Sequence, residues 1–295
     1  MSFQRKIPAI LLAGDRGPAD PVAEAAGVTR KALAHVAGEP MLARAIRTLQ
    51  QSGAVERILV VANSCHELKA DPAVHEVAEA AADGNVEFLE GAASPATSIL
   101  KILEPYSGLF PVLIATADNP LLSPEVVADF VARSGETDCD ATLAVAPMAA
   151  VKKRFPGVSR TFIRLRGEGY SGCNLFCLKN EKALAAVQFW TEIEKDRKKA
   201  LRFVAAFGLG TLFRVLFRTI GLEAAVERAS RVIGIDARPL VLDAAEAAMD
   251  VDKAEHLVMV EAYLAEQARD AGDTGPDNAP DSAPDDAPDS AEERA

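Results

Sequence analysis

The sequence predicts an α/β protein with a three-layer, doubly wound, mostly parallel sheet and a helical insertion. Two observations predict this fold class. Short apolar runs alternate with longer segments of helical periodicity in the first half of the chain, and helix crossovers between strands make neighbouring strands parallel. The apolar runs are also nearly continuous, which is typical of strands covered by helices on both faces.

The strands of the first half are predicted from apolar runs that end in turn residues. The first run, IPAILLAG, ends at a glycine and is followed by GDRG, which does not match the small-residue cleavage site of a signal peptide. It is therefore interpreted as a buried strand. The predicted strands cover 7–14, 57–63, 86–91, 111–118 and 141–148.

The helices are predicted from periodicity and from their end signals. The segment 40–53 places Met41, Ile46 and Leu49 on one face and stops at Gly53. The segment 123–134 opens with a serine cap followed by proline at the first helical position. The four predicted helices cover 40–53, 72–82, 97–106 and 123–134.

The second half is less regular. Strands are predicted at 160–166 and 170–178, followed by a helical insertion over about 179–231. Strand character returns in 232–242, and AAMDVD (247–252) is predicted to end a strand. An amphipathic helix is predicted at 253–267. Residues 1–267 are therefore interpreted as one domain.

The end of the chain has a different composition. Residues 268–295 hold nine acidic residues against two arginines and repeat a proline–aspartate theme without large apolar side chains. Such a segment cannot bury enough apolar surface to offset its conformational entropy. It is predicted to be a disordered acidic tail that carries much of the net charge of −11.

Charge and cysteine usage restrict the partners and the compartment. The remaining body is mildly acidic, which argues against duplex nucleic acid as a partner, since that requires a basic field. Four scattered cysteines do not form a disulfide framework. A cytoplasmic location is expected.

The insertion contains an unusual amphipathic run. LRFVAAFGLGTLFRVLF (201–217) is too short to span a bilayer and is interrupted by Arg202 and Arg214. Basic residues with interleaved phenylalanines suit a helix lying in an anionic membrane surface, so 199–218 is a candidate for peripheral contact at the inner membrane face. A lid or dimer helix packed over the acceptor site is the alternative. If the membrane contact holds, 160–164 and 196–199 are candidates for gripping an anionic acceptor.

A phosphate-binding turn is predicted at the end of the first strand. A glycine-bearing turn there presents backbone N–H groups to a phosphate. In LLAGDRG (11–17), Arg16 follows this turn and Lys31 lies further along, and both can neutralise phosphate charge. An ordinary strand-to-helix turn explains the same pattern.

Carboxylates follow two other apolar segments. Asp118 comes at the end of the fourth strand in TADNPLL, and Asp250 and Asp252 come in MDVD. Two carboxylates from different strand ends, together with substrate phosphates, are how Mg²⁺ is usually held. Aspartate and asparagine are also common in ordinary turns.

The order of these motifs resembles the MobA-like nucleotidyltransferases. It runs from LxAG through Lys and G-x-P-M-L to a strand-end Asp-x-Pro-Leu, then Gly-x-Asn and Asp-Val-Asp before a helix. The family has a GT-A-type fold and includes the molybdenum-cofactor guanylyl- and cytidylyltransferases. The resemblance implies an NTP triphosphate on the first loop, base and ribose contacts after the third strand, Mg²⁺ on the carboxylates and acceptor contacts in SGCN. The residues so implicated are Leu12, Ala13, Gly14, Arg16 and Lys31 for the triphosphate, Ser94 and Ser98 for the nucleoside, Asp118, Asp250 and Asp252 for Mg²⁺, and Gly172 and Asn174 for the acceptor.

The resemblance implies transfer of an NMP group from an NTP to a phosphorylated small-molecule acceptor, with release of pyrophosphate. One departure from the family pattern is Asp15, which stands where the family loop has a second glycine, and a carboxylate there would repel a triphosphate unless turned away or screened. Two alternatives stay open. One is a GT-A-type glycosyltransferase using the Asp-x-Asp sequences at 138–140 or 250–252, and the other is a non-catalytic nucleotide-binding or membrane-associated scaffold.

Overall fold

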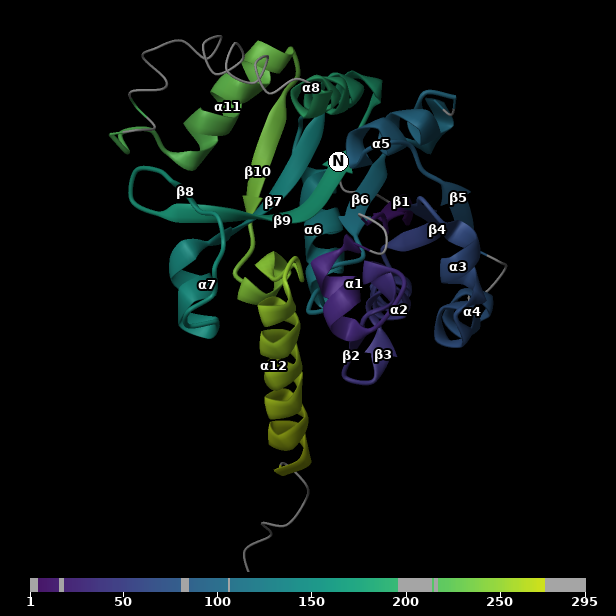
Figure 1. Ribbon diagram of the computed structural model, residues 1–295. Coiled ribbons are helices and arrows are strands. Elements are labelled where there is room, and N and C mark those ends of the chain that lie inside the picture. Colours follow the sequence, from purple (N-terminus) through teal and green to yellow (C-terminus); the bar gives the residue numbers. More distant parts are fainter. Residues whose placement is uncertain are drawn as a thin grey trace, which may run out of the picture.

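The computed structural model describes residues 5–15, 19–80, 85–105, 107–195, 214 and 217–273. Its centre is an eight-stranded sheet in the order β10-β7-β9-β6-β1-β4-β5, with β8 paired to β9. All neighbouring strands are parallel except β9, which runs antiparallel to β6, β7 and β8. The predicted fold class is confirmed (Figure 1). The strands are β1 (Ile7–Leu12), β4 (Val55–Ala62), β5 (Val86–Glu90), β6 (Val112–Thr116), β7 (Ala141–Pro147), β8 (Ile163–Arg164), β9 (Gly169–Leu178) and β10 (Ala237–Val241).

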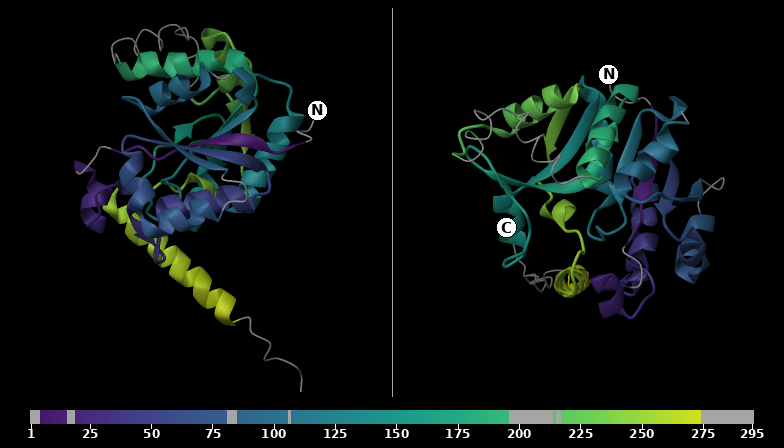
Figure 2. Two further views of the ribbon diagram at one scale, coloured as in Figure 1. Left: turned by 90° about the vertical axis from the view of Figure 1, so that its right-hand side faces the viewer. Right: turned by 45° about the horizontal axis from the view of Figure 1, so that its top comes forward.

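Helices cover both faces of the sheet, as the side view shows (Figure 2, left). One face packs against α2 (Met41–Gln51), α4 (Pro72–Glu79) and α6 (Pro124–Glu136). The other packs against α5 (Pro95–Leu103), α8 (Leu184–Lys195) and α11 (Leu222–Ile233). The remaining elements are α1 (Pro21–Ala26), α3 (Cys65–Ala70), α7 (Met148–Arg154), α12 (Ala254–Asp273), the short hairpin β2 (His35–Val36)–β3 (Glu39–Pro40), and the 3-10 turns η2 (Lys31–Leu33), η4 (Ser107–Leu109), η5 (Glu181–Ala183) and η6 (Ala245–Ala248).

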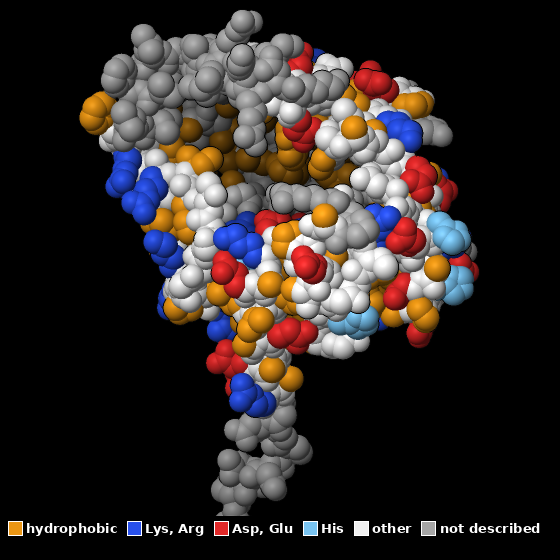
Figure 3. Space-filling model, viewed as in Figure 1, with side chains coloured by type: hydrophobic (Ala, Val, Ile, Leu, Met, Phe, Trp, Pro, Cys, Tyr) orange, Lys and Arg blue, Asp and Glu red, His pale blue; other side chains and the backbone are white. Residues whose placement is uncertain are grey.

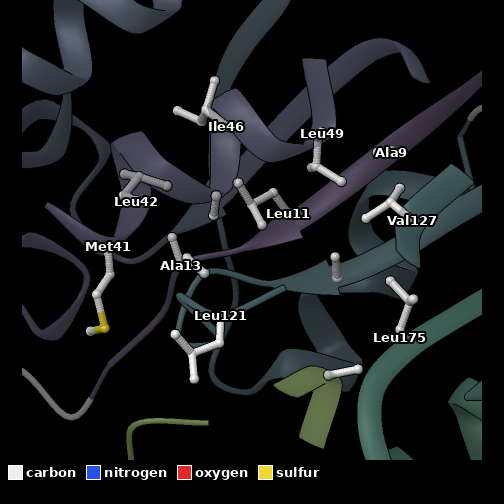
Figure 4. Packing of buried hydrophobic residues seen from close by; sticks show 14 of the residues in the cluster. Ala9, Leu11, Ala13, Met41, Leu42, Ile46, Leu49, Leu121, Val127 and Leu175 are labelled. Atoms are coloured by element: carbon white, nitrogen blue, oxygen red, sulfur yellow. The ribbon is translucent and has the colours of Figure 1, made fainter. Parts of the chain in front are cut away.

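The larger core lies between the sheet and α2. Leu11 and Ala13 from the end of β1 meet the apolar face of α2, which presents Leu42, Ile46 and Leu49 (Figure 4). Each of these side chains is buried, and burying a leucine or isoleucine contributes about 1.5–3 kcal/mol. The core therefore holds β1 firmly at the point where its following loop begins.

Two sequence predictions of local structure are wrong. AAMDVD (247–252) does not end a strand, because Ala245–Ala248 form the 3-10 turn η6. Small alanine side chains allow this tight turn to pack closely against β7 and β9. The strand expected over 232–242 begins only at Ala237, since α11 continues through Ile233 and ends at Gly234 in the left-handed conformation, with φ of 87°.

The C-terminal helix also departs from the sequence prediction. α12 continues to Asp273, beyond the boundary expected at 267, and extends away from the sheet (Figure 1). The rest of the expected tail, 274–295, lies outside the described residues, as do 196–213 and 215–216 of the insertion. Within the part of the chain that the structure describes, no helix is long and apolar enough to cross a membrane.

Candidate active site

The loops that follow β1, β4, β5 and β6 meet at one edge of the sheet. These four strands are neighbours and parallel, so their carboxyl ends share that edge, where open α/β sheets bind ligands. Ala13 N–H donates to Val61 O at 2.9 Å and Ala117 N–H donates to Leu12 O at 2.9 Å, which carries the ladder into the loops. Figure 3 shows a hollow with hydrophobic side chains on this side of the molecule.

Lys31 joins two of the predicted carboxylates. Its Nζ lies 2.7 Å from Asp118 Oδ2 and 3.0 Å from Asp252 Oδ1. Burial alone would lower the pKa of Lys31, but the two carboxylates outweigh it and the pKa is raised. Burial alone would raise the pKa of Asp252, but Lys31 outweighs it and the pKa is lowered. Lys31 and Asp252 are therefore charged at neutral pH.

Asp250 lies deeper than its neighbours and is only 4% exposed. Its Oδ2 accepts hydrogen bonds from Arg160 Nη2 at 2.8 Å and from Asn174 Nδ2 at 2.8 Å. Burial, and after it the charge of Asp118, raises the pKa of Asp250 to about 7 in spite of Arg160. A carboxyl group with a pKa this close to neutral pH is typical of a functional site.

The Asp118 and Asp250 segments are tied together through their backbones. Val251 N–H donates to Asp118 O at 2.8 Å, and Asn119 Nδ2 donates to Ala247 O at 2.7 Å. Asn119 is itself buried. These two bonds join chain segments that are far apart in the sequence, so the positions of the two carboxylates depend on each other.

The carboxylates fit a divalent cation. Asp118 Oδ1 and Asp250 Oδ1 are both buried without a hydrogen-bond partner, and a buried carboxylate oxygen without a donor is costly unless a ligand satisfies it. Among the described residues no group of three or more His, Cys, Asp or Glu side chains is arranged to hold a metal ion. Mg²⁺ is commonly held by one or two carboxylates together with substrate phosphates, and two orphaned oxygens fit that mode.

Asp15 was expected to repel a triphosphate unless turned away or screened, and its carboxylate is bound by neighbouring residues of the chain. Its Oδ2 accepts from the Lys31 backbone N–H at 2.9 Å, and its Oδ1 lies 3.4 Å from Arg30 Nη1. Arg30 also donates to Ser64 Oγ and Glu67. Asp15 thus fixes the segment that carries Lys31, and its side chain is only 3% exposed.

The serines after β5 use their hydroxyl groups within their own loop. Ser94 caps α5 in a capping box with Thr97. Ser98 Oγ accepts from Ala92 N–H at 2.8 Å and donates to Ser94 O at 2.7 Å. A Cβ at Gly91 would lie 3.0 Å from Ser98 Oγ, so only glycine fits this turn without a shift. The structure therefore shows both serines shaping the loop at the predicted edge.

The other predicted residues have different placements. Leu12, Ala13 and Gly14 lie at the end of β1, and nothing stands within 4 Å of a Cβ built at Gly14. Asn174, expected at the acceptor, is partly exposed and donates through Nδ2 to Asp250. Arg16 lies outside the described residues.

Sequence reasoning missed the roles of Arg30 and Arg160. Arg160 was expected only as a grip for an anionic acceptor, yet it donates to Asp250. A signal was available, because residues 152–166 hold six basic residues and no acid in an acidic chain. Arg30 stands next to Lys31, but its partners come from two other segments, the loop after β1 and the start of α3, that periodicity cannot bring together.

The fold and the site define a class, the α/β proteins that bind ligands at the carboxyl ends of parallel strands. A family model described as the MobA-like NTP transferase domain matches residues 9–202. The chain belongs to this family, which confirms the resemblance seen in the sequence.

Individual relatives agree with this assignment. A 2-C-methyl-D-erythritol 4-phosphate cytidylyltransferase from Cereibacter sphaeroides is 31% identical over 163 residues, 55% of this chain. The match spans 62% of that relative's length. A hypothetical transferase from Thermus thermophilus superposes with a TM-score of 0.68 at 28% identity, covering 85% of this chain and 99% of that chain.

Two more distant structures share the fold. A 4-diphosphocytidyl-2C-methyl-D-erythritol synthase from Anaerococcus prevotii has a TM-score of 0.54 at 12% identity, covering 88% of this chain and 99% of that chain. A CMP:2-keto-3-deoxy-manno-octonic acid synthetase in complex with CTP has a TM-score of 0.55 at 14% identity, covering 89% and 99%.

Proposed function

We propose that the protein transfers an NMP group from an NTP to a phosphorylated small-molecule acceptor, with release of pyrophosphate. The observation that carries this proposal is the meeting of Lys31, Asp118, Asp250 and Asp252 at the carboxyl edge of the sheet. Membership of an NTP transferase family supports the donor. CTP is the first nucleotide to test, because the curated relative is named as a cytidylyltransferase.

In the proposed reaction an oxygen of the acceptor phosphate attacks the α-phosphorus of the NTP. A new P–O bond forms there while the bond to the oxygen bridging the α- and β-phosphates breaks, and pyrophosphate leaves with that electron pair. A phosphate monoester is anionic at neutral pH because its second pKa is about 6, so the step needs no strong general base. This agrees with His256, whose Nδ1 contacts the backbone of Asp250 and Asp252 rather than open space.

Charge neutralisation is the main task of the chain's own residues. Lys31, held between Asp118 and Asp252, supplies a fixed ammonium group that can stabilise the negative charge developing on the phosphates during the reaction. Mg²⁺, when bound by Asp118 and Asp250 with phosphate oxygens, would add neutralisation at the triphosphate. Positioning of donor and acceptor supplies the rest of the rate enhancement.

The test is pyrophosphate release from each of the four NTPs with Mg²⁺, against a panel of sugar, cofactor and alcohol phosphates. Asp118→Ala is the site variant, and Asp129→Ala, on the exposed side of α6 with its side chain 54% exposed, is the matched control. Release with one NTP and one acceptor that is lost only in the Asp118 variant supports the proposal. Nucleotide binding without release from any combination contradicts it and favours a scaffold, and transfer from a nucleotide sugar favours a glycosyltransferase.

We also propose that the protein works in the cytoplasm and touches the inner face of an anionic membrane through 199–218. In the described part of this segment Phe217 is 68% exposed, and Arg214 and Arg218 are exposed beside it. Exposed aromatic and basic side chains together suit an anionic lipid surface.

Sedimentation of the full chain with vesicles tests this contact. Binding to phosphatidylglycerol-containing vesicles is expected, and salt and Phe217→Ser should weaken it. Val258→Ser changes an equally exposed apolar residue on α12 and should leave binding unchanged. Equal sedimentation with neutral and anionic vesicles, or none with either, would refute the membrane contact.

A further inference from the structure

We propose that Arg160 is a positioning residue that locks the Asp250 carboxylate with one oxygen turned toward the reacting phosphates. The inference rests on the proposed function, since it concerns how that site is organised. Arg160 lies on the loop before β8, outside the motifs that define the site in the sequence. Its side chain is only 10% exposed, so its charge is committed to neighbours within the fold.

Arg160 holds Asp250 to the sheet. Its Nη2 donates to Asp250 Oδ2 at 2.8 Å and lies 3.4 Å from Gly172 O, while its Nε donates to Ser171 Oγ at 3.3 Å. Ser171 and Gly172 belong to β9. The planar guanidinium therefore bridges a strand of the sheet and the carboxylate, an orientation that its rigid fork can fix better than a flexible ammonium can.

A second donor selects the same carboxylate oxygen. Asn174 Nδ2 donates to Asp250 Oδ2 at 2.8 Å, and Asn174 has a φ of 50°, in the left-handed region that asparagine tolerates better than most residues. Both donors thus bind Oδ2, whereas Oδ1 is buried without a partner. Such one-sided bonding fixes the plane of the carboxylate and leaves a single oxygen for a ligand.

Two basic side chains of the site, Lys31 and Arg160, contact different carboxylates. Lys31 contacts Asp118 and Asp252, and Arg160 contacts Asp250. Partners that orient a ligating carboxylate typically affect metal affinity or activity by about 10- to 100-fold when they are removed. Loss of Arg160 should therefore weaken the binding of a metal ion at Asp250, although Arg160 itself would not contact that ion.

The experiment measures Mn²⁺ binding to the full chain through the loss of the free-ion EPR signal, with pyrophosphate release measured in parallel. Arg160→Gln removes the charge and the fork, and Arg160→Lys keeps the charge alone. Arg164→Gln, an exposed arginine on β8, is the matched control. Melting temperatures of all variants are recorded, and Arg160→Lys serves as the test if Arg160→Gln does not fold.

We expect Arg160→Gln to weaken Mn²⁺ binding about 10- to 100-fold, Arg160→Lys to restore part of it, and Arg164→Gln to match the wild type. The proposal is overturned if Arg160→Gln, or Arg160→Lys where only that variant folds, binds Mn²⁺ as the wild type does. It is also overturned if the wild type shows no saturable binding. Weakened binding in the Arg160 variants with no pyrophosphate release from any chain would instead reject the proposed function, and Arg160 would then be a positioning residue of a cation site with another reaction.

Discussion

Two regions of the chain, 138–140 and 250–252, carry the same Asp-x-Asp spacing. The hydrogen bonding of their carboxylates differs. Asp140, in the first, precedes β7. Its Oδ1 accepts from Asn180 Nδ2 at 2.9 Å and its Oδ2 from Asp236 N–H at 2.9 Å. Burial alone would raise the pKa of Asp140, but these hydrogen bonds outweigh it and the pKa is lowered. Asp250, in the second, has one oxygen without a partner and a pKa raised to about 7 by burial and Asp118.

The difference follows from where each pair lies on the sheet. β7 is parallel to β6 because both run antiparallel to β9, so its amino end lies at the edge opposite the carboxyl ends. Asp140 there ties β7 to the turn before β10 and completes its own hydrogen bonding. Asp250 lies beside Asp118 at the carboxyl edge. The position of an Asp-x-Asp sequence relative to the strand ends, rather than the sequence itself, therefore distinguishes a structural carboxylate such as Asp140 from a candidate site carboxylate such as Asp250.

The largest expected effect comes from neutralising Asp118. Asp118→Asn keeps the shape of the side chain but removes one of the two carboxylate charges that contact Lys31, and one of those that would hold a cation. We expect pyrophosphate release to fall by more than about 100-fold, measured as kcat at saturating NTP. A fall of less than tenfold would place the chemistry elsewhere.

Neutralising Lys31 should have the next largest effect. Lys31→Met removes the cation between Asp118 and Asp252, and we expect about a 100-fold loss of kcat/KM. Lys253→Met is the control, because Lys253 adjoins Asp252 in sequence but is 55% exposed and pairs with Glu255. Equal losses in both variants would show a general charge effect instead.

A smaller effect is expected at Asp15. Asp15→Ala removes the acceptor of the Lys31 backbone N–H and one of the partners of Arg30, so KM for the NTP should rise about tenfold through poorer positioning of Lys31. Steady-state kinetics measure it. If KM falls instead, Asp15 acts mainly by repelling the triphosphate.

The smallest effect on activity is expected at Asp140. Asp140→Asn should change kcat less than threefold. Because the amide nitrogen of asparagine cannot accept, one of the two hydrogen bonds is lost, which costs about 0.5–1.5 kcal/mol. Because the pKa of Asp140 is lower in the folded state than its value of about 3.9 in the unfolded state, its ionisation stabilises the fold at pH values above about 3.9. This contribution is lost as the pH falls through the pKa of the folded state. The gap in melting temperature between wild type and variant should thus narrow from pH 6 to pH 3.

Much of the fold could be predicted from local pattern, and the chemistry of the site only in part. Continuous apolar runs identified the strands around β1 because burial on both faces leaves a clear signal. Asp118 follows β6 as the strand-end argument requires, whereas Asp250 and Asp252 reach it from the segment after η6 and not from a strand end. The contacts of Arg160 and the inward turn of Asp15 depend on tertiary pairing between distant loops, which periodicity does not encode. η6 was missed because its alanines suit a buried strand and a tight turn equally.

The most direct test of the central claim compares Asp250→Asn with Asp140→Asn in one pyrophosphate-release assay, with the NTP and acceptor that the wild type prefers. Asp250 is the first residue of the second Asp-x-Asp sequence, and Asp140 is the last residue of the first. Each variant replaces one carboxylate with an amide. We expect at least a 100-fold loss for Asp250→Asn and near wild-type turnover for Asp140→Asn. Equal rates in the two variants would contradict it.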